Sequence, residues 1–213
     1  MQAIERIDIS NNWVTITIVF ALFLLVLLKS INSQKLFEYS RAFFQKGFIE
    51  KKAEERMSFF SGFNLILYLF SILVYAILFT SIITLASATL THSIELFLNV
   101  LVFVFGYFTL FMLLDVVLCH LLEVRNELAY FNAAKIGYSY NMALIIFPFL
   151  IITNYSFITT YLLLSIFVVV LALSIVLIFM NNKNLILNKL FYFILYICAL
   201  KIAPLLIIYK ITV

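Results

Sequence analysis

The feature that most constrains this chain is a series of long apolar runs that contain almost no charge. Residues 161–180, YLLLSIFVVVLALSIVLIFM, form one such run without a single charged side chain. About 20 apolar residues in a helix are enough to cross the ~30 Å hydrocarbon core of a bilayer. Because only a helix satisfies its backbone polar groups within one lipid-embedded segment, these runs predict transmembrane helices.

The composition leads to the same conclusion. The chain has 213 residues, of which 66% are hydrophobic and 11% are charged, whereas a soluble domain has about 25% charged residues. Outer-membrane barrels alternate apolar and polar residues in segments of about ten, which the continuous runs here do not do. We therefore expect an all-α fold, namely a polytopic membrane protein with a six-helix transmembrane bundle.

Six spans are predicted within a single transmembrane domain that covers residues 1–213. The chain start carries Glu5 and Asp8 where a secretory signal has a basic region, so the first run is expected to remain as a helix. Pro148 interrupts the fourth run and predicts a kink or a late start there. The spans are roughly residues 13–28, 59–85, 96–122, 136–152, 157–180 and 190–208.

The distribution of Lys and Arg predicts the orientation. Residues 29–57 hold seven of the fourteen basic side chains, and alternating spans place four more on the same side. Only Arg6 and Lys210 fall on the opposite side, and Lys201 lies within a span. Since cytoplasmic loops are enriched in Lys and Arg, both termini are expected in the periplasm of a bacterial inner membrane.

The segment at residues 33–57 predicts an amphipathic helix on the cytoplasmic side. At 100° per residue, several apolar side chains between Leu36 and Phe48 share an arc of roughly 140°. Two alternatives stay open: the helix lies on the membrane surface, or it packs under the bundle. The lipid bilayer, including anionic lipid, is the expected partner. The predicted membrane-surface contacts are Phe37, Phe43, Phe44, Phe48, Lys35, Arg41 and Lys46.

Asp115 is the most unusual residue of the third span. It lies about eight residues inside the cytoplasmic end, which is ~12 Å deep by helical rise. A carboxylate at that depth needs protonation, a partner or water. Lys201, ~17 Å deep in the sixth span, is the predicted partner. The pair is expected to act either as a lock between two helices or as part of a functional polar pocket.

Further polar side chains follow Asp115 along the third span and just beyond it. Cys119 and Glu123 fall on the same helical face as Asp115, and His120 and Glu127 adjoin it. They form a possible pocket or relay, although the part from His120 onward also fits an ordinary exit into the cytoplasm. The members after Asp115 are Cys119, His120, Glu123, Arg125 and Glu127.

Other kinds of site have little support in the sequence. The only histidines, His92 and His120, would lie ~42 Å apart on one helix, so they cannot ligate one haem within a monomer. HExxH, GxSxG and P-loop patterns are missing. No metal, cofactor or nucleic-acid partner is therefore expected.

The chain also resembles a known family. MQAIERIDISNNW at the start, KKAEERMSFF after the first span and the six-span layout are similar to a membrane family of the Bacteroidota, domain of unknown function family 4271. The resemblance covers nearly the whole chain. It implies a bacterial inner-membrane location and supplies no catalytic residues.

Three functions follow as hypotheses. The favoured one is a non-enzymatic envelope scaffold or assembly partner that binds other membrane or envelope proteins, because no complete catalytic set is present. The first alternative is a small transporter or channel that uses an Asp115–Lys201 pocket. The second is a membrane enzyme that acts on a lipid-linked substrate at the cytoplasmic face.

Overall fold

A computed structural model of the chain describes residues 12–45, 48, 61–86, 93–121, 125–156 and 160–181, with side chains except at 115–121, 125–130 and 181. This described part is all-α, as predicted, and it contains no strand. Five of its helices are long and apolar enough to cross a membrane. The chain is therefore compatible with a multi-pass membrane protein.

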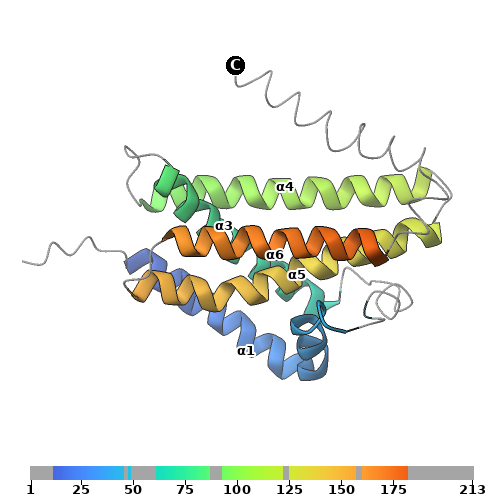
Figure 1. The fold of residues 1–213 in the computed structure, drawn as a ribbon, viewed down its shortest axis with the longest axis horizontal. Coiled ribbons are helices and arrows are strands. Elements are labelled where there is room, and N and C mark those ends of the chain that lie inside the picture. Colours follow the sequence, from blue (N-terminus) through green and yellow to red (C-terminus); the bar gives the residue numbers. More distant parts are fainter. Residues whose placement is uncertain are drawn as a thin grey trace, which may run out of the picture.

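The helices follow one another along the chain as extended rods (Figure 1). Each is long enough to cross the ~30 Å hydrocarbon core at 1.5 Å rise per residue. The predicted sixth span, residues 190–208, lies outside the described residues. The bounds are α1 Asn12–Ser40, α3 Gly62–Ala86, α4 Ile94–Leu121, α5 Arg125–Tyr155 and α6 Thr160–Asn181.

Serine hydroxyls mark the starts of two of these helices. The Ser61 hydroxyl accepts the Asn64 backbone N–H at 3.4 Å before α3, and the Ser93 hydroxyl accepts the Leu96 N–H at 3.3 Å before α4. This is the pattern of an N-cap, which satisfies one of the four N–H groups that lack a partner in the first turn.

The helix α3 is the centre of the bundle. It packs against α1, α4, α5 and α6, and α5 packs against α1, α4 and α6 as well. In Figure 1 α4, α5 and α6 run along the long axis, whereas α1 crosses them obliquely. The two central helices contribute most of the fully buried side chains, among them Leu67, Phe70, Leu78, Ile146 and Leu150.

The helix α5 is longer than the predicted fourth span. It begins at Arg125, before the predicted start at residue 136, and it continues through Pro148 to Tyr155. Proline lacks the N–H that would bond the Leu144 carbonyl, yet neighbouring packing holds the helix together. The side chain of Pro148 is exposed, whereas Phe147 beside it is buried and meets Phe70 of α3 edge-on at 5.2 Å between ring centroids.

The segment after the first span corrects the expectation of one amphipathic helix over residues 33–57. α1 ends at Ser40, and residues 41–44 form turns, in which the Arg41 carbonyl accepts the N–H groups of Phe44 and Gln45. The aromatic side chains between 36 and 48 therefore do not share one helical face. Phe44 is 87% exposed, whereas Phe48 is 2% exposed and belongs to the core.

Candidate functional site

The predicted pair of Asp115 and Lys201 is not described at the level of side chains. Asp115, Cys119 and His120 lie on α4, which reaches Leu121, and Arg125 and Glu127 lie in the first turn of α5. The side chains of these five residues, together with Lys46, Glu123 and Lys201, lie outside the described part. The pocket or relay that they were expected to form stays a prediction.

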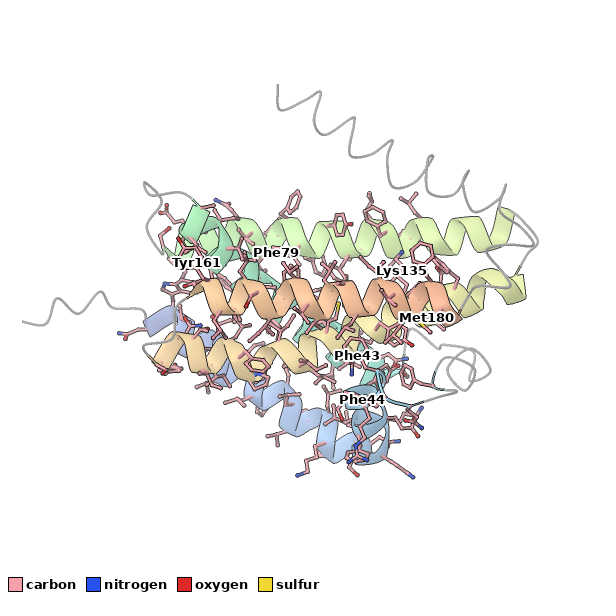
Figure 2. The ribbon with its side chains drawn as sticks, in the orientation of Figure 1. Phe43, Phe44, Phe79, Lys135, Tyr161 and Met180 are labelled. Carbon is pink, nitrogen blue, oxygen red and sulfur yellow. The ribbon has the colours of Figure 1, made fainter. Side chains whose placement is uncertain are left out.

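The structure brings a different cation to this part of α4. The ammonium of Lys135, on α5, lies 5.6 Å from the centroid of the Phe111 ring (Figure 2). Phe111 precedes Asp115 by one helical turn. Lys135 directly precedes the predicted fourth span at residues 136–152, so it was expected in the loop before that span. With α5 starting at Arg125, Lys135 is instead inside a helix that packs against α4.

An open groove of about 690 Å³ lies beside the second half of α1. One part of its lining is basic or polar and the other is apolar, and α5 contributes Leu144. A groove with both kinds of surface suits a ligand that has a polar head and an apolar body. Its lining residues are Lys29, Ser33, Gln34, Leu36, Phe37, Ser40 and Leu144.

A kink in α1 shapes this groove. Asn32 has φ −157° and ψ 93°, which are extended values inside an otherwise helical segment. Its side-chain oxygen accepts the Lys35 backbone N–H at 2.9 Å, three residues further on. Asn32 is thus an N-cap for residues 33–40, which turn away from the membrane-spanning part of α1. The signal was present in the sequence, since Asn between helical segments is a frequent cap.

Cationic and aromatic side chains gather at the same end of α1. The Arg41 guanidinium lies 4.1 Å from the centroid of the Phe37 ring, a cation–π geometry, and Phe37 lines the groove. Phe43 stacks on Tyr138 of α5 at 5.6 Å between centroids. Figure 2 shows Phe43 and Phe44 at this end of the molecule. Of the predicted surface contacts, Phe37 and Phe44 are exposed, Phe43 is half-buried and Phe48 is buried.

Asn141 connects α5 to the end of α1. It is fully buried, and its amide nitrogen donates to the backbone carbonyls of Tyr39 and, at 3.0 Å, of Ser40. These carbonyls belong to the last turn of α1, and the Tyr39 carbonyl also accepts the Ala42 N–H at 3.3 Å. A side chain from another helix therefore caps α1 at its C-terminus. Asn141 falls within the predicted fourth span at residues 136–152, where no contact was predicted for it.

Aromatic rings surround this cap. The Tyr39 ring meets Phe48 edge-on at 5.5 Å and Tyr140 edge-on at 5.9 Å between centroids. Tyr39 is 1% exposed, so the end of α1 is anchored in the core even though neighbouring Phe37 is open.

The Tyr68 hydroxyl on α3 and the Asn141 side-chain oxygen on α5 are among the buried oxygens that form no hydrogen bond with the described residues. Nearby, the Tyr75 hydroxyl of α3 donates to the Ser139 carbonyl of α5 at 2.7 Å. A hydrogen bond between the two central helices thus lies at Tyr75 and Ser139.

The buried serine and threonine side chains of the described core bond to their own helices. The hydroxyls of Ser71, Thr80 and Ser81 donate to carbonyls four residues earlier in α3, at 2.7 to 3.0 Å. Ser174 does the same in α6 at 2.9 Å. Such back-bonding satisfies a hydroxyl without any partner helix or water. These groups therefore need no polar pathway around them.

Comparison with known proteins identifies a family. Neither the curated proteins nor the solved structures gave a match to the chain. Residues 14–212, however, match a family described as a domain of unknown function, DUF4271. The match includes all five described helices except the first residues of α1. The chain therefore belongs to the DUF4271 family.

Proposed function

We propose that the chain is a non-enzymatic scaffold or assembly partner of the bacterial inner membrane, with both termini in the periplasm. The uneven distribution of Lys and Arg supports the orientation. The location rests on this orientation and on the resemblance of the sequence to an inner-membrane family. The scaffold role is supported by how the described helices bury or expose their polar and apolar side chains.

The main support is the state of the polar groups inside the described bundle. Buried polar residues there are serine, threonine and asparagine, and most donate to carbonyls of their own helix. A transporter needs polar groups that face a path along which an ion or solute moves. In the described core the Tyr68 hydroxyl and the Asn141 side-chain oxygen are among the buried oxygens that form no hydrogen bond. This packing fits a protein that binds neighbours through its outer surface.

That outer surface is available on two helices. In the most apolar stretches of α4 and α6, only 17% of residues are buried within the chain. Val102 and Phe103 on α4, and Tyr161 and Val169 on α6, are all more than half exposed. In a bilayer such faces contact either lipid or the helices of other proteins.

Photocrosslinking tests the scaffold role. A benzophenone-bearing phenylalanine is placed at Phe103 on α4, at Tyr161 on α6, or at the fully buried Phe70 on α3 as a matched aromatic control. After irradiation of intact cells, we expect an adduct of discrete mass with another membrane protein from Phe103 or Tyr161. The Phe70 position should give none, since it contacts only this chain.

A different outcome of the crosslinking experiment would contradict the scaffold role. Adducts with lipid alone at both exposed positions, together with ion or solute flux into proteoliposomes that contain the pure protein, would replace the scaffold with the transporter. Mass spectrometry of the adducts distinguishes another protein from a second copy of this chain.

Cysteine labelling tests the orientation separately. The two native cysteines, Cys119 and Cys198, are first replaced by alanine. Gln45→Cys and Ser156→Cys then place single thiols at exposed positions at opposite ends of the described bundle. A membrane-impermeant maleimide added to spheroplasts should label the thiol at 156 and not the one at 45. Labelling at 45 alone would reverse the proposed orientation.

A further inference from the structure

We propose that the groove at the kink of α1 binds one anionic phospholipid, whose phosphate lies at Lys29 and whose acyl chain lies against Leu36, Phe37 and Leu144. This site is independent of the scaffold role, because it requires only that the chain lies in a membrane.

The groove is placed where a lipid head group lies. Lys29 is the first charge after the apolar run at residues 13–28, so it marks the boundary between hydrocarbon and head groups. The kink at Asn32 then directs residues 33–40 away from the membrane-spanning part of α1. The groove is open, about 690 Å³, and lined by both α1 and α5, so a lipid can enter sideways from the bilayer.

The charge of the lining complements a phosphate. Between residues 29 and 45 the basic side chains are Lys29, Lys35 and Arg41, and Glu38 is the one acid. Lys29 lines the groove itself. Lysine binds phosphate as a compact cation with three N–H donors. An anionic head group is therefore preferred over a zwitterionic one, whose positive group Lys29 repels.

Neutral donors stand beside Lys29. The side chains of Ser33 and Gln34 line the groove and form no hydrogen bond with other described residues. Their hydroxyl and amide N–H groups are consequently available to phosphate or glycerol oxygens. Ser40 also lines the groove, but its hydroxyl already donates to the Phe37 carbonyl at 2.8 Å, so it offers only an acceptor.

The other part of the lining suits an acyl chain. Leu36, Phe37 and Leu144 are apolar, and Phe37 is 53% exposed within the chain. The Arg41 guanidinium lies 4.1 Å from the Phe37 centroid, which places a second cation at the edge of this apolar surface. A soluble phosphate compound would leave the apolar wall uncovered, whereas a phospholipid covers both parts.

Native mass spectrometry of the full-length protein in detergent tests this site. The protein is titrated with dioleoyl phosphatidylglycerol or with dioleoyl phosphatidylcholine, which share their acyl chains and differ in net charge. We expect the first phosphatidylglycerol to bind at least five-fold more tightly. Lys29→Gln should weaken that first binding about five-fold, the effect of one basic side chain near a membrane surface.

Two further variants separate a groove from general surface attraction. Ser33→Phe keeps the charge but fills the groove, and it should weaken the first phosphatidylglycerol about as much as Lys29→Gln. Lys35→Gln removes the same charge six residues away, outside the groove lining, and should change binding less than two-fold. A thermal unfolding curve for each variant shows whether it is folded. Where a variant is not folded, Lys29→Arg takes its place. This substitution keeps the charge and is expected to bind phosphatidylglycerol like the parent protein.

Three results would overturn the proposal. Equal binding of the two lipids removes the anionic site. Equal loss in Lys29→Gln and Lys35→Gln, with no loss in Ser33→Phe, means diffuse attraction to the surface. Displacement of the lipid by millimolar inorganic phosphate means a site for a soluble phosphate compound instead.

Discussion

The helices α3 and α6 both have strongly apolar sequences, but they differ in how much of each is buried within the chain. In its most apolar stretch α6 has a mean hydropathy of 3.3 and α3 has 2.5, so α6 is the stronger candidate for a buried helix. Yet 61% of that stretch of α3 is buried within the chain, against 17% for α6. The less apolar helix occupies the centre of the bundle.

The difference follows from the solvent. In water the most apolar helix goes to the core, because burial removes apolar surface from water. In a bilayer the surrounding lipid is as apolar as leucine, so this driving force between helices is lost. Packing and interhelical hydrogen bonds then decide which helix is central. Tyr75, which donates to the Ser139 carbonyl of α5, gives α3 such a bond.

The largest expected effect concerns the predicted pair of Asp115 and Lys201. If the pair forms, α4 is held by an ion pair in addition to packing, and Lys201→Met should lower the free energy of unfolding by ~3–5 kcal/mol, the typical cost of leaving a buried charge without its partner. Asp115→Asn in the same chain should recover most of that loss. The free energy is measured by titration with sodium dodecyl sulfate in mixed micelles.

Lys135→Met tests whether Lys135, and not Lys201, is the partner of Asp115, because the Lys135 ammonium lies over the Phe111 ring one turn before Asp115. If Asp115→Asn compensates for Lys135→Met and not for Lys201→Met, the predicted partner is wrong. If the effects of Asp115→Asn and Lys201→Met are simply additive, the two residues do not interact.

The next effect compares leucines of the two helices. Leu67 of α3 is 0% exposed and Leu173 of α6 is 50% exposed. Leu67→Ala should cost ~2–5 kcal/mol of unfolding free energy, because it leaves a cavity among packed side chains. Leu173→Ala should cost less than ~1 kcal/mol, since lipid fills the space. Similar losses for both, in the same micelle titration, would show that α6 is as well packed as α3.

Two glycines provide a sharper version of the same test. A Cβ atom added at Gly137 of α5 would lie 2.9 Å from Cε1 of the Phe48 ring, whereas one added at Gly106 of α4 would meet nothing within 4 Å. Phe48 is buried and packs against Tyr39, so its ring has little room to move. Gly137→Ala should therefore destabilise the protein by ~1–3 kcal/mol.

Gly106→Ala, the matched control, should be neutral or stabilise by up to ~1 kcal/mol, because alanine favours helix more than glycine does. Phe48→Leu introduced together with Gly137→Ala should cost less than the two changes add up to. Strict additivity of the two would mean that the residues are not in contact in solution. Thermal unfolding of the parent, the three single variants and the double variant in one detergent supplies these values.

The smallest effect concerns a single hydroxyl. Tyr75→Phe removes the donor to the Ser139 carbonyl between α3 and α5, and interhelical hydrogen bonds in membranes contribute about 0.6 kcal/mol on average and up to ~1.7. Tyr161→Phe on α6 removes a hydroxyl from a side chain that is 67% exposed and should change stability by less than ~0.5 kcal/mol. Equal melting temperatures for the two variants would remove this bond as a reason for the central position of α3.

Much of the helical layout was predictable. Predicted spans at residues 59–85 and 157–180 lie close to α3 and α6, because a long uncharged run in a bilayer has few options besides a helix. The start of α5 was not predicted at Arg125, since the polar residues before Ile136 read as a loop. Those residues continue the helix because nothing in LAYFNAAK breaks it, and α4 and α6 pack beside it.

The candidate site was predictable only in part. Lys35, Arg41, Phe37 and Phe44 were recognised as a basic and aromatic group near a membrane surface, which is a property of local sequence. The turn after Ser40, however, lies beside Asn141, which is 101 residues from Ser40 and caps the end of α1. Phe48 was assigned to the surface because helical periodicity was extended past this turn.

The long uncharged runs are enough to predict apolar helices, because an unpaired backbone amide in hydrocarbon costs more than any local preference. It also contained the charge asymmetry on which the proposed orientation rests. Tertiary packing places α3 and α5 at the centre, turns the apolar faces of α4 and α6 outward, and opens a groove lined by Lys29 beside the kink at Asn32. Lipid and the protein interior are nearly equally apolar. Which helices are central and which faces point outward therefore depend on side-chain fit and a few hydrogen bonds between distant residues.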